Sequence, residues 1–319
     1  MTTTPALSRR RTLGTSDLDV AELCLGGNVF GWTATQDESF EVLDAYVAAG
    51  GNFIDTADAY SDWKPGNSGG ESEAIIGNWI ASRGNRDSVV IATKVGKLST
   101  ATGLSAETIV RAAENSLARL RTDHIDLYYA HMDDRAVPLE ESLGAFDTLV
   151  RSGKVRYIAA SNFTGERLAD ALEVSEQEGF ASFVALQNHY NLMERKEYEE
   201  DVRSIVAQNG LGSLPYYSLA RGFLTGKYRG GLVTDSPRAK GVEQYMNDRG
   251  ERVLVALESC ADERSTSIAS VALAWLLAQP TITAPIASAR NLEQLDQLLG
   301  LSTVTLTPEE LAGLERASA

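Results

Sequence analysis

Short apolar runs alternate with helical runs along almost the whole chain, and this alternation limits the fold more than any other feature. Eight of the apolar runs are typical of β-strands covered on both faces: residues 21–25, 52–55, 89–93, 125–130, 155–160, 182–186, 212–216 and 282–286. Helical patterns lie between them, for example at residues 39–49, 106–120, 139–152 and 267–279. Strand–helix units without a break in composition predict an α/β fold, a (β/α)8 TIM barrel that spans residues 1–319 as a single domain.

Three segments fall outside this repeat. Residues 11–25 contain Gly14 between short β-like runs and predict a hairpin at the bottom of the barrel, behind a flexible tail of residues 1–10. The glycine-rich loop 219–247 carries several basic residues, and long loops in compact domains are usually functional. Thr307 followed by Pro308 predicts the start of an extra C-terminal helix, with Thr307 as its N-cap.

Charge and cysteine content exclude several classes of partner. The chain holds 44 acidic and 29 basic residues, a formal net charge of −15, which disfavours nucleic acid and anionic membranes. Cys24 and Cys260 form no paired pattern and the first residues do not resemble a secretory signal, so we expect a cytoplasmic protein. The 3 histidines occur in no metal-binding motif, so we expect no bound metal.

Polar side chains follow the predicted strands at their carboxyl ends, which in such barrels meet at the mouth of the active site. Asp55 ends the second strand, and Tyr60 follows it shortly. Lys94 follows the third strand and His131 the fourth. The next three strands lead into Ser161 and Asn162, Gln187, and Tyr216. Each residue alone has a structural interpretation, such as a helix cap, a rim aromatic, a surface lysine or a core histidine. Their convergence on one rim indicates an active site instead.

The residue types at this rim favour proton transfer by a side chain, coupled to a second group that donates something other than a proton. A tyrosine with a pKa near 10 is a poor acid at neutral pH unless a cation stabilises its phenolate. Lys94 is placed to supply that charge, and Asp55 to hold the lysine. No serine or cysteine nucleophile accompanies them, so hydride from a nicotinamide is the natural partner reaction.

At these positions the sequence closely resembles the aldo-keto reductases, in the branch that includes the potassium-channel β subunits. The resemblance covers essentially the whole chain and rests on motifs in the family's order. These are RTLGTSDLDVAELCLGG (residues 11–27), NFIDTADAY (52–60), GESEAIIG (70–77), IATKVG (91–96), IDLYYAH (125–131), GKVRYIAASNF (153–163), QNHYNL (187–192) and LARGFLTGKY (219–228).

The resemblance implies an oxidoreductase that reduces an aldehyde or ketone to an alcohol by hydride transfer from NADPH. It makes Tyr60 the general acid and Lys94 with Asp55 its tuning pair, while His131 orients the carbonyl. The residues that it assigns to the cofactor, besides Asp55, are Gly27, Asn28, Ser161, Asn162, Gln187, Tyr216, Tyr217, Leu219, Arg221, Lys227, Arg238, Ser288, Arg290, Gln294 and Gln297. Of these, Arg290 has independent support as a 2'-phosphate ligand, because a forked arginine just before a helix (292–299) suits an anion.

Specificity is expected to lie in the variable loops. Trp32 and Trp63 follow the first two strands, and Met132 follows the proposed catalytic histidine, so these three are candidate substrate contacts. Loop packing explains the two tryptophans equally well. The chain departs from the family at residues 217–218, 287–288 and 297–298, where Tyr-Ser, Ala-Ser and Gln-Leu replace the usual Ser-Pro, Pro-Gly and Glu-Asn.

Other functions on this fold stay open at the level of sequence. The same site can work in the oxidative direction, as an alcohol or sugar dehydrogenase. A cofactor-binding regulatory or sensor protein is a second alternative, and a structural or storage protein a third. The expected partner is a small carbonyl compound, and the sequence does not decide whether the chain forms a homo-oligomer.

Overall fold

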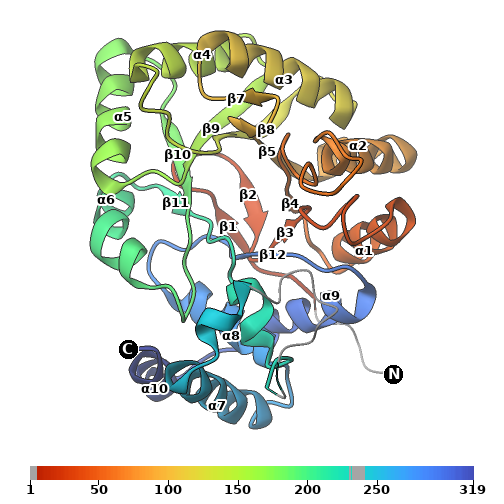
Figure 1. The fold of residues 1–319 in the computed structure, drawn as a ribbon, viewed down its shortest axis with the longest axis vertical. Helices are drawn as coiled ribbons and strands as arrows, with labels where there is room; N and C mark the ends of the chain where they lie inside the picture. Colours follow the sequence, from red (N-terminus) through yellow and green to blue (C-terminus); the bar gives the residue numbers. More distant parts are fainter. Residues whose placement is uncertain (1–5, 230, 232–240) are drawn as a thin grey trace.

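The computed structural model describes residues 6–229, 231 and 241–319. In these residues, eight parallel strands form a central sheet with helices around it (Figure 1). The strands pair in the order β11-β10-β9-β8-β5-β4-β3-β12. Their bounds are β3 (Cys24–Gly26), β4 (Phe53–Asp55), β5 (Val90–Val95), β8 (Ile125–Ala130), β9 (Val155–Ser161), β10 (Phe183–Gln187), β11 (Gly212–Ser213) and β12 (Ile286–Ala287).

Hydrogen bonds between the two ends of this order close the sheet into a barrel. Ser213 in β11 forms a parallel bridge with Ile282, and the Ile286 N–H donates to the Pro215 carbonyl at 2.9 Å. The predicted (β/α)8 barrel is therefore confirmed. The strand predicted at residues 21–25 is wrong as a single element, because the chain breaks after Ala21 and only Cys24 re-enters the barrel.

A hairpin covers the amino ends of the strands, as predicted. β1 (Arg10–Thr12) pairs antiparallel with β2 (Asp19–Ala21), and Leu13 between them is buried in the apolar cluster inside the barrel. Gly14 in the turn has φ of +54°, and a Cβ there would lie 2.0 Å from the Val184 carbonyl oxygen. Only glycine fits this position. The opposite end of the barrel, where the strands finish, stays open to form a site.

Residues 6–10, which were predicted to belong to a flexible tail, contact the barrel. Leu7 is buried, and its N–H donates to the Ala49 carbonyl at 2.7 Å. Arg9 forms an ion pair with the buried Glu22 at 2.9 Å. Residues 1–5 lie outside the described part of the chain.

Helices surround the barrel between successive strands (Figure 1). Those on its outer face are α1 (Gln36–Ala48), α2 (Glu71–Arg83), α3 (Ala106–Leu120), α4 (Leu139–Arg151), α5 (Gly165–Glu178), α6 (Arg203–Gln208), α8 (Ile268–Ala278) and α9 (Leu292–Leu299). Outside this ring, α7 (Asp248–Asp262) and α10 (Pro308–Ser318) pack against each other. The predicted C-terminal helix is α10, and Thr307 caps it with the Glu310 side chain in a reciprocal capping box. No helix among the described residues is long and apolar enough to span a membrane.

Two loop segments stand above the carboxyl ends of the strands. A small hairpin of β6 (Lys97–Leu98) and β7 (Ala101–Thr102) follows β5 directly. The described parts of loop 219–247 include two short 3-10 turns, η3 (Ala220–Thr225) and η5 (Glu243–Tyr245). Phe223 and Tyr245 bring these turns together, with ring centroids 5.7 Å apart. Other short turns are η1 (Arg86–Ser88), η2 (Tyr198–Val202) and η6 (Gly300–Thr303).

Candidate active site

The barrel brings the polar residues predicted at the strand ends to one rim. Asp55 is the last residue of β4, and Lys94 lies near the end of β5. His131 follows β8 directly, and its backbone N–H donates to the Val95 carbonyl at 2.9 Å. All these strands run parallel, so their carboxyl ends meet at one end of the barrel.

Asp55, Tyr60 and Lys94 form a closed triangle of hydrogen bonds. The Lys94 Nζ donates to Asp55 Oδ2 at 2.6 Å and to the Tyr60 hydroxyl at 2.7 Å. The Tyr60 hydroxyl in turn donates to Asp55 Oδ2 at 3.0 Å. Gln187 fixes the other carboxylate oxygen by donating to Asp55 Oδ1 at 2.8 Å. Lys94 and Asp55 are fully buried, so the ion pair is held in one geometry beneath the tyrosine.

Burial shifts the pKa values of Tyr60 and Lys94 in opposite directions. Burial and then the Asp55 carboxylate raise the pKa of Tyr60 well above its ordinary value. Burial also lowers the pKa of Lys94, although Asp55 opposes this change. The Tyr60 hydroxyl donates to an anion in a dry environment, and both conditions favour its protonated form. Tyr60 consequently holds its proton throughout the neutral range.

The imidazole of His131 lies across from the Tyr60 ring, and it is neutral. The ring centroids of the two residues are 6.1 Å apart. Burial first, and then the charges of Lys94 and Lys97, lower the pKa of His131 well below its ordinary value. Its buried Nδ1 has no hydrogen-bond partner in the described part of the chain. A neutral imidazole has one N–H to donate, and a carbonyl oxygen is a suitable acceptor for it.

A pocket of about 690 Å³ opens above this triangle. Most residues predicted to bind cofactor or substrate line it. They are Asn28, Trp32, Asp55, Tyr60, Trp63, His131, Ser161, Asn162, Gln187, Tyr216, Tyr217, Leu219, Arg221, Lys227, Ser288, Arg290, Gln294 and Gln297. They lie at the carboxyl ends of seven different strands or in the segments that follow these strands, so residues far apart in the sequence meet in one pocket.

Three of the predicted site residues that the structure describes do not line the pocket. Lys94 is fully buried beneath it, where its Nζ contacts Tyr60, Asp55 and the Thr56 carbonyl. Gly27 faces inward, since a Cβ there would lie 2.8 Å from the Ser72 hydroxyl, and its neighbour Gly26 lines the pocket instead. Met132 is 38% exposed and turned to solvent rather than into the pocket. Arg238 lies outside the described residues.

The part of the pocket nearest the triangle carries amide and hydroxyl groups in a fixed array. The Asn162 Nδ2 donates to the Ser161 hydroxyl at 2.9 Å and to the His131 carbonyl at 2.8 Å. The Tyr216 hydroxyl donates to Asn162 Oδ1 at 2.7 Å. One face of the Tyr216 ring stacks on His189, with ring centroids 5.4 Å apart. This stacking holds the tyrosine ring in place at the pocket wall.

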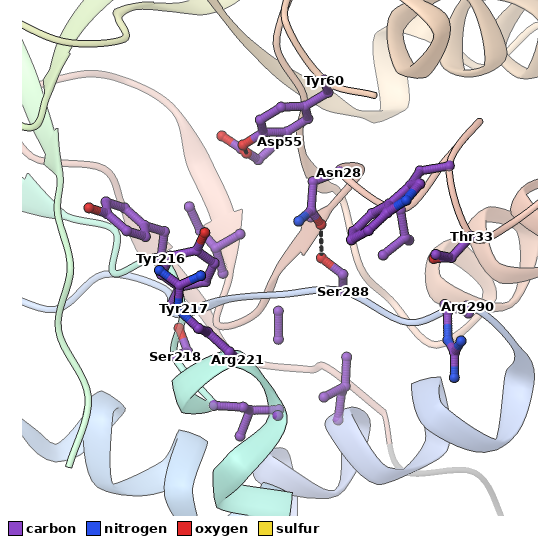
Figure 2. A pocket seen from close by; sticks show the side chains of 18 of the residues that line it. Asn28, Thr33, Asp55, Tyr60, Tyr216, Tyr217, Ser218, Arg221, Ser288 and Arg290 are labelled. Carbon is purple, nitrogen blue, oxygen red and sulfur yellow. Dashed lines mark hydrogen bonds between the residues drawn. The ribbon is translucent and has the colours of Figure 1, made fainter. Parts of the chain in front are cut away.

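The far part of the pocket is basic. In Figure 2, Arg221 and Arg290 lie well away from Tyr60 and Asp55, with the hydrogen-bonded pair Asn28 and Ser288 between them. Arg221 stacks over the Tyr217 ring at 4.2 Å, and its buried Nε has no hydrogen-bond partner within the described ranges.

The backbone around Arg221 is unusual. Tyr217, Ala220 and Arg221 have φ values of +50°, +46° and +59°, in the left-handed region that non-glycine residues rarely adopt. Such conformations concentrate at ligand sites, where the fold imposes them. Here they turn the start of loop 219–247 toward the pocket.

Arg290 lies at the entrance to α9. The Arg290 N–H donates to Gln294 Oε1 at 3.1 Å, and the Asn291 side chain caps the helix by accepting from the Gln294 N–H at 3.0 Å. Helix N-termini carry a partial positive charge, so the Arg290 side chain and this helix end favour the same kind of ligand, an anion.

Two tryptophans form an aromatic wall beside Tyr60. Trp32 and Trp63 meet edge to face, with ring centroids 5.4 Å apart. Trp63 also lies 6.3 Å from the Tyr60 ring and is 48% exposed. Aromatic surface left open beside a reactive hydroxyl suits the apolar body of a substrate.

Several pocket-lining residues were not predicted from the sequence. They include Gly26, Thr33, Asp62, Lys97, Ser218 and Thr225. For Lys97 there was a signal, since it follows the third strand by a few residues on the same side of the barrel as Lys94. No local pattern distinguishes Thr33 or Thr225 from ordinary loop residues.

Comparison with known proteins agrees with this geometry. A family model described as the aldo/keto reductase family matches residues 22–319. The uncharacterized oxidoreductase YrpG of Bacillus subtilis is 37% identical, with 94% of this chain and 92% of that protein covered. Norsolorinic acid reductase B of Aspergillus parasiticus is 30% identical, covering 99% and 86%. A probable voltage-gated potassium channel subunit beta of Oryza sativa is 31% identical, covering 96% and 95%.

The closed barrel, with a tyrosine, lysine, aspartate and histidine at its carboxyl end, defines a barrel oxidoreductase as the class of protein. Within that class, the chain belongs to the aldo/keto reductase family.

Proposed function

We propose that this protein reduces an aldehyde or ketone to an alcohol with NADPH as hydride donor and Tyr60 as proton donor. The observation that carries the proposal is the buried triangle of Asp55, Tyr60 and Lys94 under the open pocket. A hydroxyl that keeps its proton and has a cation 2.7 Å away is equipped to give that proton to a reacting group.

The residues of the pocket fit a nicotinamide dinucleotide phosphate. Arg221 has a buried, unpartnered Nε and, with Lys227 and Arg290, would hold the phosphates. Ser161, Asn162 and Gln187 would bind the carboxamide, and Tyr216 would stack on the nicotinamide ring. The remaining predicted contacts would come from Asn28, Tyr217, Leu219, Ser288, Gln294 and Gln297. When bound, the cofactor supplies a hydride to the carbonyl carbon.

Tyr60 would supply the proton to the carbonyl oxygen. In the structure its hydroxyl donates to Asp55, so it must turn this hydrogen bond toward the substrate. As the proton leaves, the Lys94 Nζ already lies in position to stabilise the phenolate. An alkoxide is a far stronger base than a phenolate, so this transfer stays favourable even with the raised pKa of Tyr60.

His131 would orient the substrate rather than transfer a proton. Its neutral ring can donate one N–H to the carbonyl oxygen, and the lowered pKa keeps it from becoming a competing acid. Asp55 would hold Lys94 as a cation, a positioning role supported by its contacts with Lys94 and Gln187.

The test compares Tyr60→Phe with the wild type on a panel of aldehydes and ketones. We expect turnover to fall by about 10²–10⁴-fold, the usual contribution of a general acid. NADPH affinity, measured by quenching of protein fluorescence, should stay near the wild-type value because the ring is kept. Tyr157→Phe, which removes a hydroxyl bonded to the Asp17 N–H on the opposite face, is the matched control. A Tyr60→Phe protein with near wild-type turnover would exclude Tyr60 as the acid.

The same assays separate the alternatives. Rapid alcohol oxidation with NADP⁺ and slow carbonyl reduction would favour a dehydrogenase. Tight NADPH binding without turnover on any substrate would favour a cofactor-binding regulatory role, the alternative to which the name of the Oryza sativa relative points.

A further inference from the structure

Lys97 is a pocket-lining cation that the proposed reaction does not use. It lies on β6, and Gly96, with φ of +114°, turns the chain there immediately after β5. The β6–β7 hairpin fixes its backbone by pairing Lys97 with Thr102. The same pocket surface includes Tyr60, Trp63 and His131. Lys97 therefore belongs to the catalytic end of the pocket.

The ammonium of Lys97 lacks a counter-charge. No carboxylate in the described part of the chain lies within 4.0 Å of it, although Asp62 lines the same pocket. The nearby Asp55 is already engaged by Lys94, Tyr60 and Gln187. Burial and the charge of Lys94 lower the pKa of Lys97, and its charge in turn contributes to the lowered pKa of His131. The Lys97 side chain is nevertheless exposed at the pocket surface, so an anion that enters the pocket can reach its ammonium directly.

The cofactor phosphates do not account for this cation. The basic groups suited to them are on other elements: Arg221 and Lys227 in or next to η3, and Arg290 before α9. Figure 2 shows Arg221 and Arg290 on the side of the pocket away from Tyr60. The anion that pairs with Lys97 would therefore come from the substrate.

We propose that Lys97 binds a carboxylate of the substrate, so that the preferred carbonyl compounds carry an acid group as well as the reacting aldehyde or ketone. This inference rests on the proposed function and names its substrate class. A single lysine offers one compact charge, which suits a carboxylate, whereas phosphate groups usually gather several donors. The edge-to-face pair of Trp32 and Trp63 offers an apolar wall for the body of such a molecule.

The experiment uses two aldehydes of nearly the same shape, 4-carboxybenzaldehyde and the uncharged 4-nitrobenzaldehyde. Lys97→Met keeps the length of the side chain and removes its charge. We expect KM for 4-carboxybenzaldehyde to rise about tenfold or more relative to KM for 4-nitrobenzaldehyde, the usual loss for a charge-assisted hydrogen bond. Lys154→Met is the matched control. Lys154 directly precedes β9, so it lies at the amino end of the strands, opposite the pocket.

A binding measurement keeps this inference distinguishable from the proposed function. Tryptophan fluorescence is titrated with 4-carboxybenzaldehyde in Tyr60→Phe and in the double variant Tyr60→Phe with Lys97→Met. Weaker binding only when Lys97 is replaced supports the carboxylate site, even if the wild type reduces neither aldehyde and the proposed function fails. Equal binding in the two proteins, or equal changes in KM for both aldehydes, overturns it.

Discussion

The buried Asp58 carboxyl, close to the site, offers a quantitative test of how burial changes a pKa and, through it, the stability of the fold. Its side chain is fully buried, and neither carboxylate oxygen makes a hydrogen bond of ordinary geometry with any described residue. Burial, and then the charge of Glu73, raise the pKa of Asp58 to about 7. Arg119 and Lys94 oppose the rise only in part, because Glu73 is itself the partner of Arg119 at 2.6 Å.

The sign and size of the effect on stability follow from linkage. An aspartate in the unfolded chain has a pKa of about 3.9, so between about pH 4 and pH 7 the folded state keeps a proton that the unfolded state has lost. Stability therefore falls as pH rises through this window. A pKa difference of this size corresponds to about 4 kcal/mol at pH 8, and almost none below pH 4. Asp58→Asn cannot ionise, so it should remove this destabilisation.

Urea unfolding of wild type and Asp58→Asn, followed by circular dichroism at pH 5 and pH 8, measures the effect. We expect the variant to gain stability relative to wild type on going from pH 5 to pH 8, by up to about 3 kcal/mol, since only part of the penalty is present at pH 5. Asp170→Asn, on the exposed face of α5, is the control and should show no such gain. A stability difference between Asp58→Asn and wild type that is the same at both pH values would refute the reasoning.

Two further predictions concern the cofactor. Arg290→Ala should weaken NADPH binding by about ten- to a hundredfold, the equivalent of about 1.5–3 kcal/mol for a charge-assisted contact, and should leave NADH binding nearly unchanged; fluorescence titration with both cofactors checks this, and equal weakening of the two would remove Arg290 as the discriminating residue. Loop 219–247 should close over bound cofactor, so hydrogen exchange of residues 219–229 and 241–247 should slow when NADP⁺ is added; unchanged exchange in both segments would argue against closure.

Local sequence patterns predict most of the fold and most of the residues of the site. Alternating apolar runs mark each strand, and the residue just after a run falls at the carboxyl end whatever the details of packing. In a parallel barrel all such ends meet, so Asp55, Lys94 and His131 were predictable together. The family motifs added the cofactor residues, and nearly all of those described line the pocket.

Whether an individual residue faces the pocket was less predictable. Neighbouring residues such as Gly26 and Gly27 share one motif, yet only Gly26 lines the pocket. The strand predicted at residues 21–25 likewise joins two elements, because the break between β2 and β3 depends on hairpin packing and not on hydrophobicity.

The order of residues along the chain is enough to predict that a tyrosine, a lysine, an aspartate and a histidine share one end of a barrel. The charge states in and around this site depend instead on packing in the folded protein. Among the described residues, Tyr60 has a raised pKa, Lys97 has no carboxylate within 4.0 Å and neither carboxylate oxygen of Asp58 has a hydrogen-bond partner. Each of these properties depends on distances of a few ångströms between groups far apart in the chain, and on how completely water is excluded around them. Residue order fixes neither quantity, because both arise when strands and loops from the whole chain pack together.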